Sequence, residues 1–212
     1  MPKHKGLFIA FEGCEGCGKS TQAGLLYDEL LRRNKPVVLT HEPGGTPLGD
    51  NVRKILKVKR DYAISPLAEL LLFNSCRAQL MRDVILPALG KGVSVVCDRF
   101  TGSTLAYQGY GRGLELETVA SINSAATGGL EPDLIFLLDL QPQAGLKRKR
   151  NINDDRFEAE DITFHRTVRD GYLELAGRDP ARWIVLDAQQ PMSVLGKAVL
   201  DRVLPLLNKQ IT

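Results

Sequence analysis

The stretch Gly13-Cys14-Glu15-Gly16-Cys17-Gly18-Lys19-Ser20 matches the phosphate-binding loop pattern G-x-x-x-x-G-K-[ST]. An apolar run over residues 7–11 precedes it and predicts a buried strand, and leucines at helical spacing after it predict a helix over residues 20–33. This loop requires such a setting, because its glycines let backbone N–H groups surround phosphate oxygens at a helix N-terminus. The sequence therefore predicts a site for the phosphates of a nucleoside triphosphate.

Within this loop, particular side chains have expected roles. Lys19 is expected to lie in a solvent-facing position and to reach the β- and γ-phosphates, and the Ser20 hydroxyl is expected to ligate Mg²⁺. Thr21 completes the set of residues that we expect around ATP. Further along, Asp98 ends an apolar strand over residues 93–97, and its carboxylate is expected to hold Mg²⁺ through water or to orient the accepting oxygen. The alternative for Asp98 is a cap on the following helix, and Arg99 is expected to bridge two phosphate groups.

Composition limits the class of protein. The chain has 212 residues, 43% of them hydrophobic and 25% charged, which suits one sizeable core. A net charge of +3 gives no reason to expect a nucleic-acid or membrane partner. No signal peptide or spanning segment is visible, so we expect a cytoplasmic protein with four free thiols. The C-x-x-C pair inside the loop leaves a metal or redox role open as the weaker alternative.

Strands and helices alternate along the chain. Apolar runs predict strands over residues 7–11, 37–40, 93–97, 134–138 and 183–187. Helices are expected over residues 20–33, 65–86, 116–126, 155–175 and 192–207, with another after residue 46. Continuous apolar strands separated by helices indicate an α/β fold with a five-stranded parallel sheet and helices on both faces, here the P-loop NTPase fold. Ligands in such sheets bind beyond the carboxyl ends of the strands.

A basic run, Lys147-Arg148-Lys149-Arg150, follows the fourth predicted strand. It is compatible with a nucleic-acid patch or a solvated helix face. Beside a phosphate loop a third interpretation gains weight, because an arginine delivered by a closing lid stabilises the charge that develops during phosphoryl transfer. We therefore expect a lid over about residues 142–157.

The chain resembles the thymidylate kinase family, of the bacterial type, along almost its whole length. The resemblance is carried by residues 11–21, Glu42-Pro43-Gly44-Gly45-Thr46, the Phe73…Arg77-Ala78-Gln79 helix, Asp98-Arg99-Phe100 and the run from Tyr107 to Gly113. It implies ATP-dependent phosphorylation of dTMP to dTDP with Mg²⁺. It also implies a single nucleoside monophosphate kinase domain over residues 1–212, and a homodimer.

The resemblance also implies how dTMP is held. Phe73 looks like the ring that stacks on thymine, and Arg77 like the residue that bonds its O4. Thr104 and Gln108 look like further base contacts. From spacing alone, Phe73 in the core and Arg77 as a surface charge would be the favoured interpretation of this pair.

Sugar and phosphate contacts follow from the same resemblance. Tyr107 looks like the ring against the deoxyribose, where it disfavours a 2′-hydroxyl. Glu15 looks like the acid near the 3′-hydroxyl. Arg53 and Arg99 look like the clamp on the dTMP phosphate.

The resemblance places the catalytic arginine in the lid, because the phosphate loop of this chain contains no arginine. Arg150 is the first candidate. Arg148 is the second candidate, with packing on adenine as its alternative role. Arg156 is the third candidate, with an ion pair beside Asp155 as its alternative role.

Other functions remain open from the residues alone. A kinase for another monophosphate or for a deoxynucleoside is the nearest alternative among enzymes. A small GTPase switch is the alternative among binding proteins, but no N-K-x-D motif follows the fourth predicted strand, where Leu138-Asp139-Leu140-Gln141 leads into the basic run.

Overall fold

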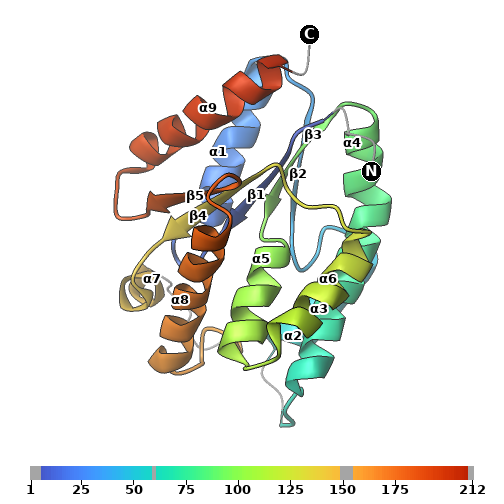
Figure 1. Ribbon diagram of the computed structural model, residues 1–212, viewed down its shortest axis with the longest axis vertical. Helices are drawn as coiled ribbons and strands as arrows, with labels where there is room; N and C mark the ends of the chain where they lie inside the picture. The colour runs from blue at the N-terminus through green and yellow to red at the C-terminus, as the bar shows by residue number, and fades with distance from the viewer. Residues whose placement is uncertain (1–5, 59–60, 149–154, 210–212) are drawn as a thin grey trace.

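The computed structural model describes residues 6–58, 61–148 and 155–209. Five parallel strands form one sheet with the order β2-β3-β1-β4-β5 (Figure 1). The strands are β1 (Phe8–Glu12), β2 (Val37–His41), β3 (Ser94–Asp98), β4 (Leu134–Asp139) and β5 (Trp183–Asp187). The predicted five-stranded parallel sheet is therefore confirmed.

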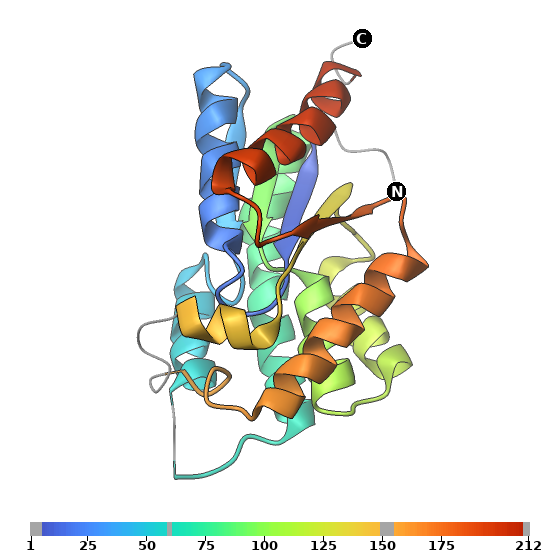
Figure 2. The same cartoon turned by 90° about the vertical axis from the view of Figure 1, so that its left-hand side faces the viewer.

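Helices cover both faces of this sheet (Figures 1 and 2). Their bounds are α1 (Lys19–Arg32), α2 (Pro47–Lys57), α3 (Pro66–Leu80), the π-helical turn η1 (Met81–Ile85), α4 (Leu86–Gly90), α5 (Thr101–Thr104), the π-helical turn η2 (Leu105–Gly111), α6 (Leu116–Thr127), α7 (Pro142–Arg148), α8 (Ile162–Arg178) and α9 (Met192–Lys209). In the described part of the chain, none of these helices has the length and apolar character needed to cross a membrane.

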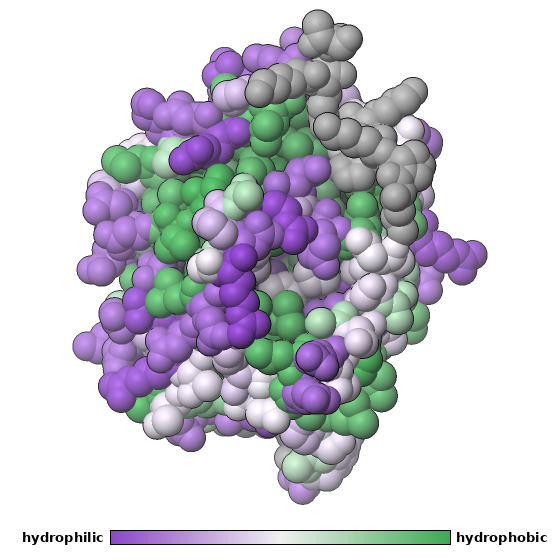
Figure 3. Space-filling model, in the orientation of Figure 1, coloured by the Kyte–Doolittle hydropathy of each residue, from purple (hydrophilic) through white to green (hydrophobic). Residues whose placement is uncertain are grey.

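The central strand shows how two cores arise from one sequence. Side chains alternate between the faces of a strand, so Phe8 and Ala10 pack on one side of β1 and Ile9 and Phe11 on the other. The first side meets α3, α4, η2 and α8, and the second meets α1 and α9. Burial on both sides explains why β1 reads as a continuous apolar run. Figure 3 shows polar side chains over much of one outer face, with apolar ones reaching the surface between them.

The structure differs from the expected helices in two places. The helix expected from residue 155 begins at Ile162, because the Asp161 side chain caps it by accepting a hydrogen bond from Phe164 N at 2.8 Å. The segment just before the cap forms turns instead. Residues 101–111, for which no helix was expected, are helical as α5 and η2. By contrast, Ser65 caps α3 and Pro66 occupies its first turn, as the sequence predicts.

Sheet topology brings the informative loops together. β1 lies between β3 and β4, and Phe11 is in register with Asp98. The carboxyl ends of neighbouring parallel strands meet at one edge, so the loop after β1 lies beside the Asp98-Arg99 turn. Figure 2 shows α7 crossing this edge near the start of α1.

Candidate functional site

The phosphate loop connects β1 directly to α1. Gly13 and Gly16 have φ values of 135° and 68°, which only glycine adopts readily. A Cβ on Gly13 would lie 2.5 Å from the Leu138 carbonyl oxygen, so the loop also packs against the end of β4. The Lys19 ammonium donates to the Cys14 carbonyl at 2.7 Å and approaches Cys17 Sγ at 3.4 Å. Lys19 is buried, which corrects its expected solvent-facing position. The backbone of the phosphate loop therefore binds the Lys19 ammonium in this structure.

Asp98 and Ser20 form the polar centre between β1 and β3. The Ser20 hydroxyl donates a hydrogen bond to Asp98 Oδ2. The other oxygen, Asp98 Oδ1, is buried and accepts no hydrogen bond from the described residues. A buried carboxylate oxygen without a partner is costly, so this atom is suited to a cation. Hydroxyl and carboxylate oxygens are ligands that Mg²⁺ prefers.

Arg99 sits at the centre of a polar cluster. Its backbone is left-handed, with φ 73°, which turns the side chain back over the phosphate loop. The guanidinium donates to Glu15 at 2.8 Å and to the Gly13 carbonyl at 3.0 Å. It also donates to the hydroxyls of Ser103 and Tyr172, each at 3.2 Å. So many contacts fix the charge in place before any ligand binds.

Glu15 is the carboxylate that faces Arg99. Burial raises the pKa of Glu15, but the nearby Arg99 and Lys19 charges outweigh burial and hold the pKa at about 2. The Tyr107 hydroxyl donates a further hydrogen bond to Glu15. Glu15 is therefore ionised at neutral pH and acts as an acceptor.

Glu12 is a buried carboxylate beside the Arg99 cluster, and the sequence analysis did not predict a role for it. It accepts hydrogen bonds from Phe100 N at 2.9 Å, Ser103 Oγ at 2.6 Å and Tyr172 OH at 3.0 Å. Burial raises the pKa of Glu12, partly opposed by these hydrogen bonds and by the Arg99 charge. The sequence feature that could have identified Glu12 is its position in the motif of residues 11–21, directly before the phosphate loop.

A cavity of about 760 Å³ runs along this edge of the sheet. Its lining unites residues from the phosphate loop with residues from α2, α3 and α5–η2. Among the predicted site residues it includes Glu15, Gly16, Gly18, Lys19, Ser20, Thr21, Arg53, Phe73, Asp98, Arg99, Thr104, Tyr107, Gln108 and Arg148. Arg53 donates to the Pro43 carbonyl at 2.8 Å.

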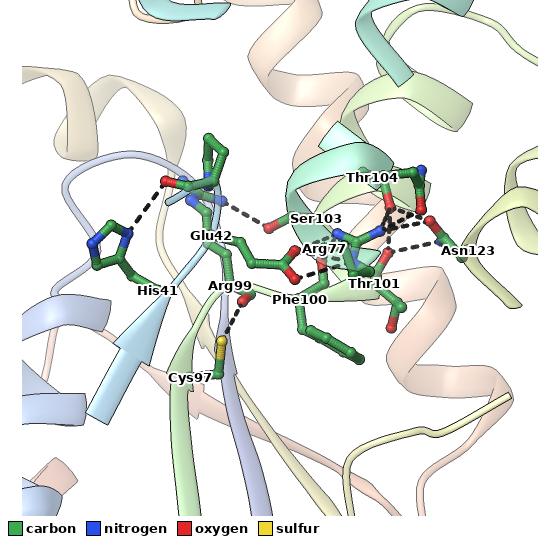
Figure 4. A network of polar contacts seen from close by, with 12 residues as sticks. His41, Glu42, Arg77, Cys97, Arg99, Phe100, Thr101, Ser103, Thr104 and Asn123 are labelled. Carbon is green, nitrogen blue, oxygen red and sulfur yellow. Dashed lines mark hydrogen bonds and ion pairs between the residues drawn. The ribbon is translucent and has the colours of Figure 1, made fainter. Parts of the chain in front are cut away.

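Of the residues predicted to contact dTMP, all of which the structure describes, Arg77 is the one that does not line this cavity. It is 1% exposed, and its guanidinium pairs with Glu42 at 2.6 Å (Figure 4). It also donates to Asn123 Oδ1 at 2.7 Å, to the Phe100 carbonyl at 3.0 Å and to Thr104 Oγ1 at 3.1 Å. Arg77 is thus neither a surface charge nor an open donor, and its contact with thymine stays a prediction.

A second hollow of about 390 Å³ lies on the other side of the phosphate loop. Cys17, Gln22, Arg148, Ala188 and Met192 are among its lining residues. The Arg148 guanidinium donates to the Ala188 carbonyl at 3.2 Å. Its location, beyond the triphosphate loop and away from Phe73, suits the base of the donor nucleotide.

Comparison with known proteins identifies the family. The family model described as thymidylate kinase matches residues 11–199. A thymidylate kinase of Dehalococcoides mccartyi strain 195 is 54% identical over 202 residues, covering 95% of this chain and 98% of that protein. The chain belongs to the thymidylate kinase family. A thymidylate kinase of Roseiflexus sp. strain RS-1 is 47% identical, with 95% of both chains covered.

A solved member of the thymidylate kinase family has the same fold. The crystal structure of thymidylate kinase from Ehrlichia chaffeensis matches with a TM-score of 0.79 and 32% identity, over 93% of this chain and 98% of that one. The predicted P-loop NTPase fold and the predicted phosphotransferase class are thereby confirmed.

The arginines expected in the lid of this family member have different surroundings. Arg148 donates to the carbonyls of Gly16 and Ala188, which both line the second hollow, whereas Arg150 lies outside the described residues. Arg156 pairs with Glu69 at 2.6 Å, and Asp155 pairs instead with Lys57 at 2.6 Å. Arg156 therefore does form an ion pair, but its partner is Glu69 and not its neighbour Asp155.

The cysteines show no sign of a metal centre. All four are buried free thiols, and burial raises the pKa of the Cys14 thiol. Within the described ranges, no group of three His, Cys, Asp or Glu side chains is placed to hold a metal ion.

Proposed function

We propose that this chain transfers the γ-phosphoryl group of ATP to dTMP, giving ADP and dTDP, as its family does. One observation carries the proposal: the phosphate loop and Phe73, Tyr107 and Gln108 line the same cavity. A cavity of about 760 Å³ accommodates a nucleotide with its phosphate directed at the loop. The triphosphate of ATP then lies over the phosphate loop. Its γ-phosphate meets the phosphate of dTMP at the point where the loop borders the cavity.

Fixed positive charge supports the transfer step. Phosphoryl transfer relies on positioning and electrostatic stabilisation, because the developing charge spreads over the phosphate oxygens. Lys19, Arg53 and Arg99 all face the cavity. We assign Arg53 and Arg99 to the dTMP phosphate. We assign Lys19 to the β- and γ-phosphates, where its ammonium exchanges the Cys14 carbonyl for phosphate oxygens. Backbone groups of residues 13–21 complete the ATP-phosphate site.

Ser20 and Asp98 are the residues that would hold Mg²⁺. The fit rests on the Ser20 hydroxyl beside Asp98 and on the buried Asp98 Oδ1 described above. When bound, the ion supplies positive charge to the ATP phosphates.

For the acceptor nucleotide, we assign Phe73 to stacking on the base and Tyr107 to the deoxyribose. The ionised Glu15 accepts a hydrogen bond from the 3′-hydroxyl. We assign Thr104 and Arg77 to the edge of the base. Each of the Arg77 contacts described above already uses an N–H, so a bond to O4 requires Arg77 to share an N–H that now bonds Thr104 or Asn123.

We further propose that residues 1–212 form one nucleoside monophosphate kinase domain whose lid spans about residues 142–157. Arg150 is our first choice for the catalytic arginine. Arg148 is assigned to the adenine side, because it contacts the phosphate loop and the turn after β5.

A homodimer and a cytoplasmic location complete the proposal. On α2 and α3, four apolar side chains are 38–51% exposed: Leu48, Ile55, Leu67 and Leu71. Such a surface suits a second copy of the chain. Light scattering of the wild type and of Leu71→Asp tests it, since a monomeric wild type contradicts it. Four free thiols suit a reducing compartment.

A coupled ADP-release assay tests the function directly. ADP release should depend on dTMP and should be much slower with dCMP, AMP or thymidine. Lys19→Ala should lower kcat by about two to three decades without a loss of folded structure by circular dichroism. A wild-type protein that releases ADP equally with and without dTMP would refute the proposal.

A further inference from the structure

Glu69 is a buried carboxylate whose role the reaction leaves unassigned. It lies on α3, four residues before Phe73, and is 0% exposed. Residues four apart share a helix face, so Glu69 points to the same side of α3 as the ring that lines the cavity. A buried charge persists only where partners satisfy it. The partners of Glu69 therefore indicate what it does.

Three side chains donate to this carboxylate. Gln108 Nε2 donates to Oε1 at 2.6 Å, Arg112 Nε donates to the same oxygen at 3.2 Å, and Arg156 Nη1 reaches Oε2 at 2.6 Å. Arg112 also pairs with Glu160 at 2.7 Å. Among these partners, Gln108 is the one that lines the nucleotide cavity.

This contact fixes which end of the Gln108 amide faces the cavity. A carboxylate only accepts hydrogen bonds, so the atom bonded to Glu69 must be the amide nitrogen. The amide oxygen, Gln108 Oε1, then points away from Glu69. Within the described residues Oε1 accepts no hydrogen bond, and the Gln108 side chain lines the cavity. It is therefore the acceptor that remains available at the cavity.

We propose that Glu69 is a positioning residue that locks the Gln108 amide with its oxygen toward the base, so that the site selects a base edge carrying an N–H donor. Thymine presents N3–H at that edge, whereas cytosine presents a bare N3 acceptor there. If Gln108 Oε1 faces cytosine N3, both atoms are acceptors and neither forms a hydrogen bond. Such a mismatch discriminates strongly against dCMP. The Thr104 hydroxyl does not impose this choice, because a hydroxyl can both donate and accept; it donates to the Thr101 carbonyl and accepts from Arg77. This inference rests on the proposed dTMP kinase function.

The test compares kcat/KM for dTMP and dCMP. In Glu69→Gln the neighbouring amide donates as well as accepts, so Gln108 is free to turn over and present its NH₂ group. We expect the dTMP/dCMP ratio of kcat/KM to fall by about tenfold. Glu160→Gln is the matched control, since it removes a carboxylate from Arg112 but does not touch Gln108. Its ratio should stay within about twofold of wild type.

The exchanged pair Glu69→Gln/Gln108→Glu provides the rescue. There the amide at position 69 donates to a carboxylate at 108, whose other oxygen again faces the base as an acceptor only. We expect the ratio to return toward the wild-type value. A carboxylate that only stabilised the fold would lower activity with both substrates equally and would not be rescued. An unchanged ratio in folded Glu69→Gln would overturn the inference.

A measurement on the wild type is independent of how the variants fold. N3-methyl-dTMP lacks the N3–H donor, and we expect its kcat/KM to be at least about tenfold below that of dTMP. dUMP retains N3–H and serves as the comparison, and equal use of N3-methyl-dTMP and dTMP would overturn the inference. Absence of any dTMP-dependent ADP release would instead refute the underlying function.

Discussion

Gly145→Ala should uncouple α7 from the phosphate loop. Gly145 lies against the loop backbone: a Cβ there would be 2.1 Å from the Glu15 carbonyl oxygen. The reverse contact is equally close, since a Cβ on Gly16 would lie 2.0 Å from the Gly145 carbonyl oxygen. A carbon and a carbonyl oxygen ordinarily approach to about 3.4 Å. Alanine therefore requires the backbone of α7 and the backbone of the phosphate loop to move apart by about 1 Å. A change of side-chain rotamer cannot relieve this contact, because both sides of it are backbone.

The kinetic effect follows from what α7 carries. It holds Arg148 against the second hollow and forms the first part of the proposed lid. A displacement of about 1 Å in a positioning element costs roughly a hundredfold in rate. We expect kcat to fall by about two decades and KM for ATP to rise by about tenfold. KM for dTMP should rise less than KM for ATP, because Phe73 and Gln108 are on other elements and Glu15 is the proposed dTMP contact that lies at the clash.

The assay is steady-state kinetics with each substrate varied, together with a melting curve. Gly24→Ala is the control, because it introduces the same methyl group on α1 where no atom lies within 4 Å. It should be as active as wild type. If folded Gly145→Ala keeps kcat and KM for ATP within about twofold, the contact between α7 and the loop has no part in catalysis.

Three further predictions concern single charges. Arg77→Ala should lower the free energy of unfolding by about 3–5 kcal/mol in urea titrations, because it leaves Glu42 buried and unpaired; a loss of dTMP affinity without a loss of stability would contradict this. Glu15 has its pKa lowered from 4.5 to about 2, so its stabilising contribution is full above about pH 4.5 and is lost as the pH falls toward 2. The stability advantage of wild type over Glu15→Gln should shrink by about 3 kcal/mol across that window, and a constant difference would argue against the Arg99 contact. Among single alanine variants of the lid arginines, Arg150→Ala should lower kcat by about two decades or more, whereas Arg156→Ala should mainly lower the melting temperature; equal kcat values in all variants would refute a lid-supplied arginine.

The sequence predicted the features that depend on local backbone. The phosphate loop, the strands and the Ser65 cap of α3 each follow from neighbouring residues, so their patterns are visible along the chain. The helical structure of residues 101–111 was not predicted, because Gly102 and Gly109 weaken the helical pattern there. Tertiary packing, which a single sequence does not display, makes that segment helical.

Long-range partners set the limits of the sequence-based site. Arg77 reads as a surface charge by spacing, since the acceptors that bury it, Glu42 and Asn123, are distant in sequence. The same holds for Glu69, whose donors come from η2 and from the segment before α8. Resemblance to the thymidylate kinase family identified cavity residues such as Gln108 but gave no information on the carboxylates that orient them.

The central position of β1 also shapes how the chain is made. Phe8 pairs with Val95 and Ile9 with Leu134, so the first strand to leave the ribosome has no sheet partner until almost half of the chain has been synthesised. Such distant pairing slows folding. Until β3 arrives, the apolar β1 segment remains open to contacts with other chains, which makes nascent and truncated forms prone to aggregation. Chains truncated before β3 should therefore accumulate as insoluble protein, whatever the stability of the finished enzyme.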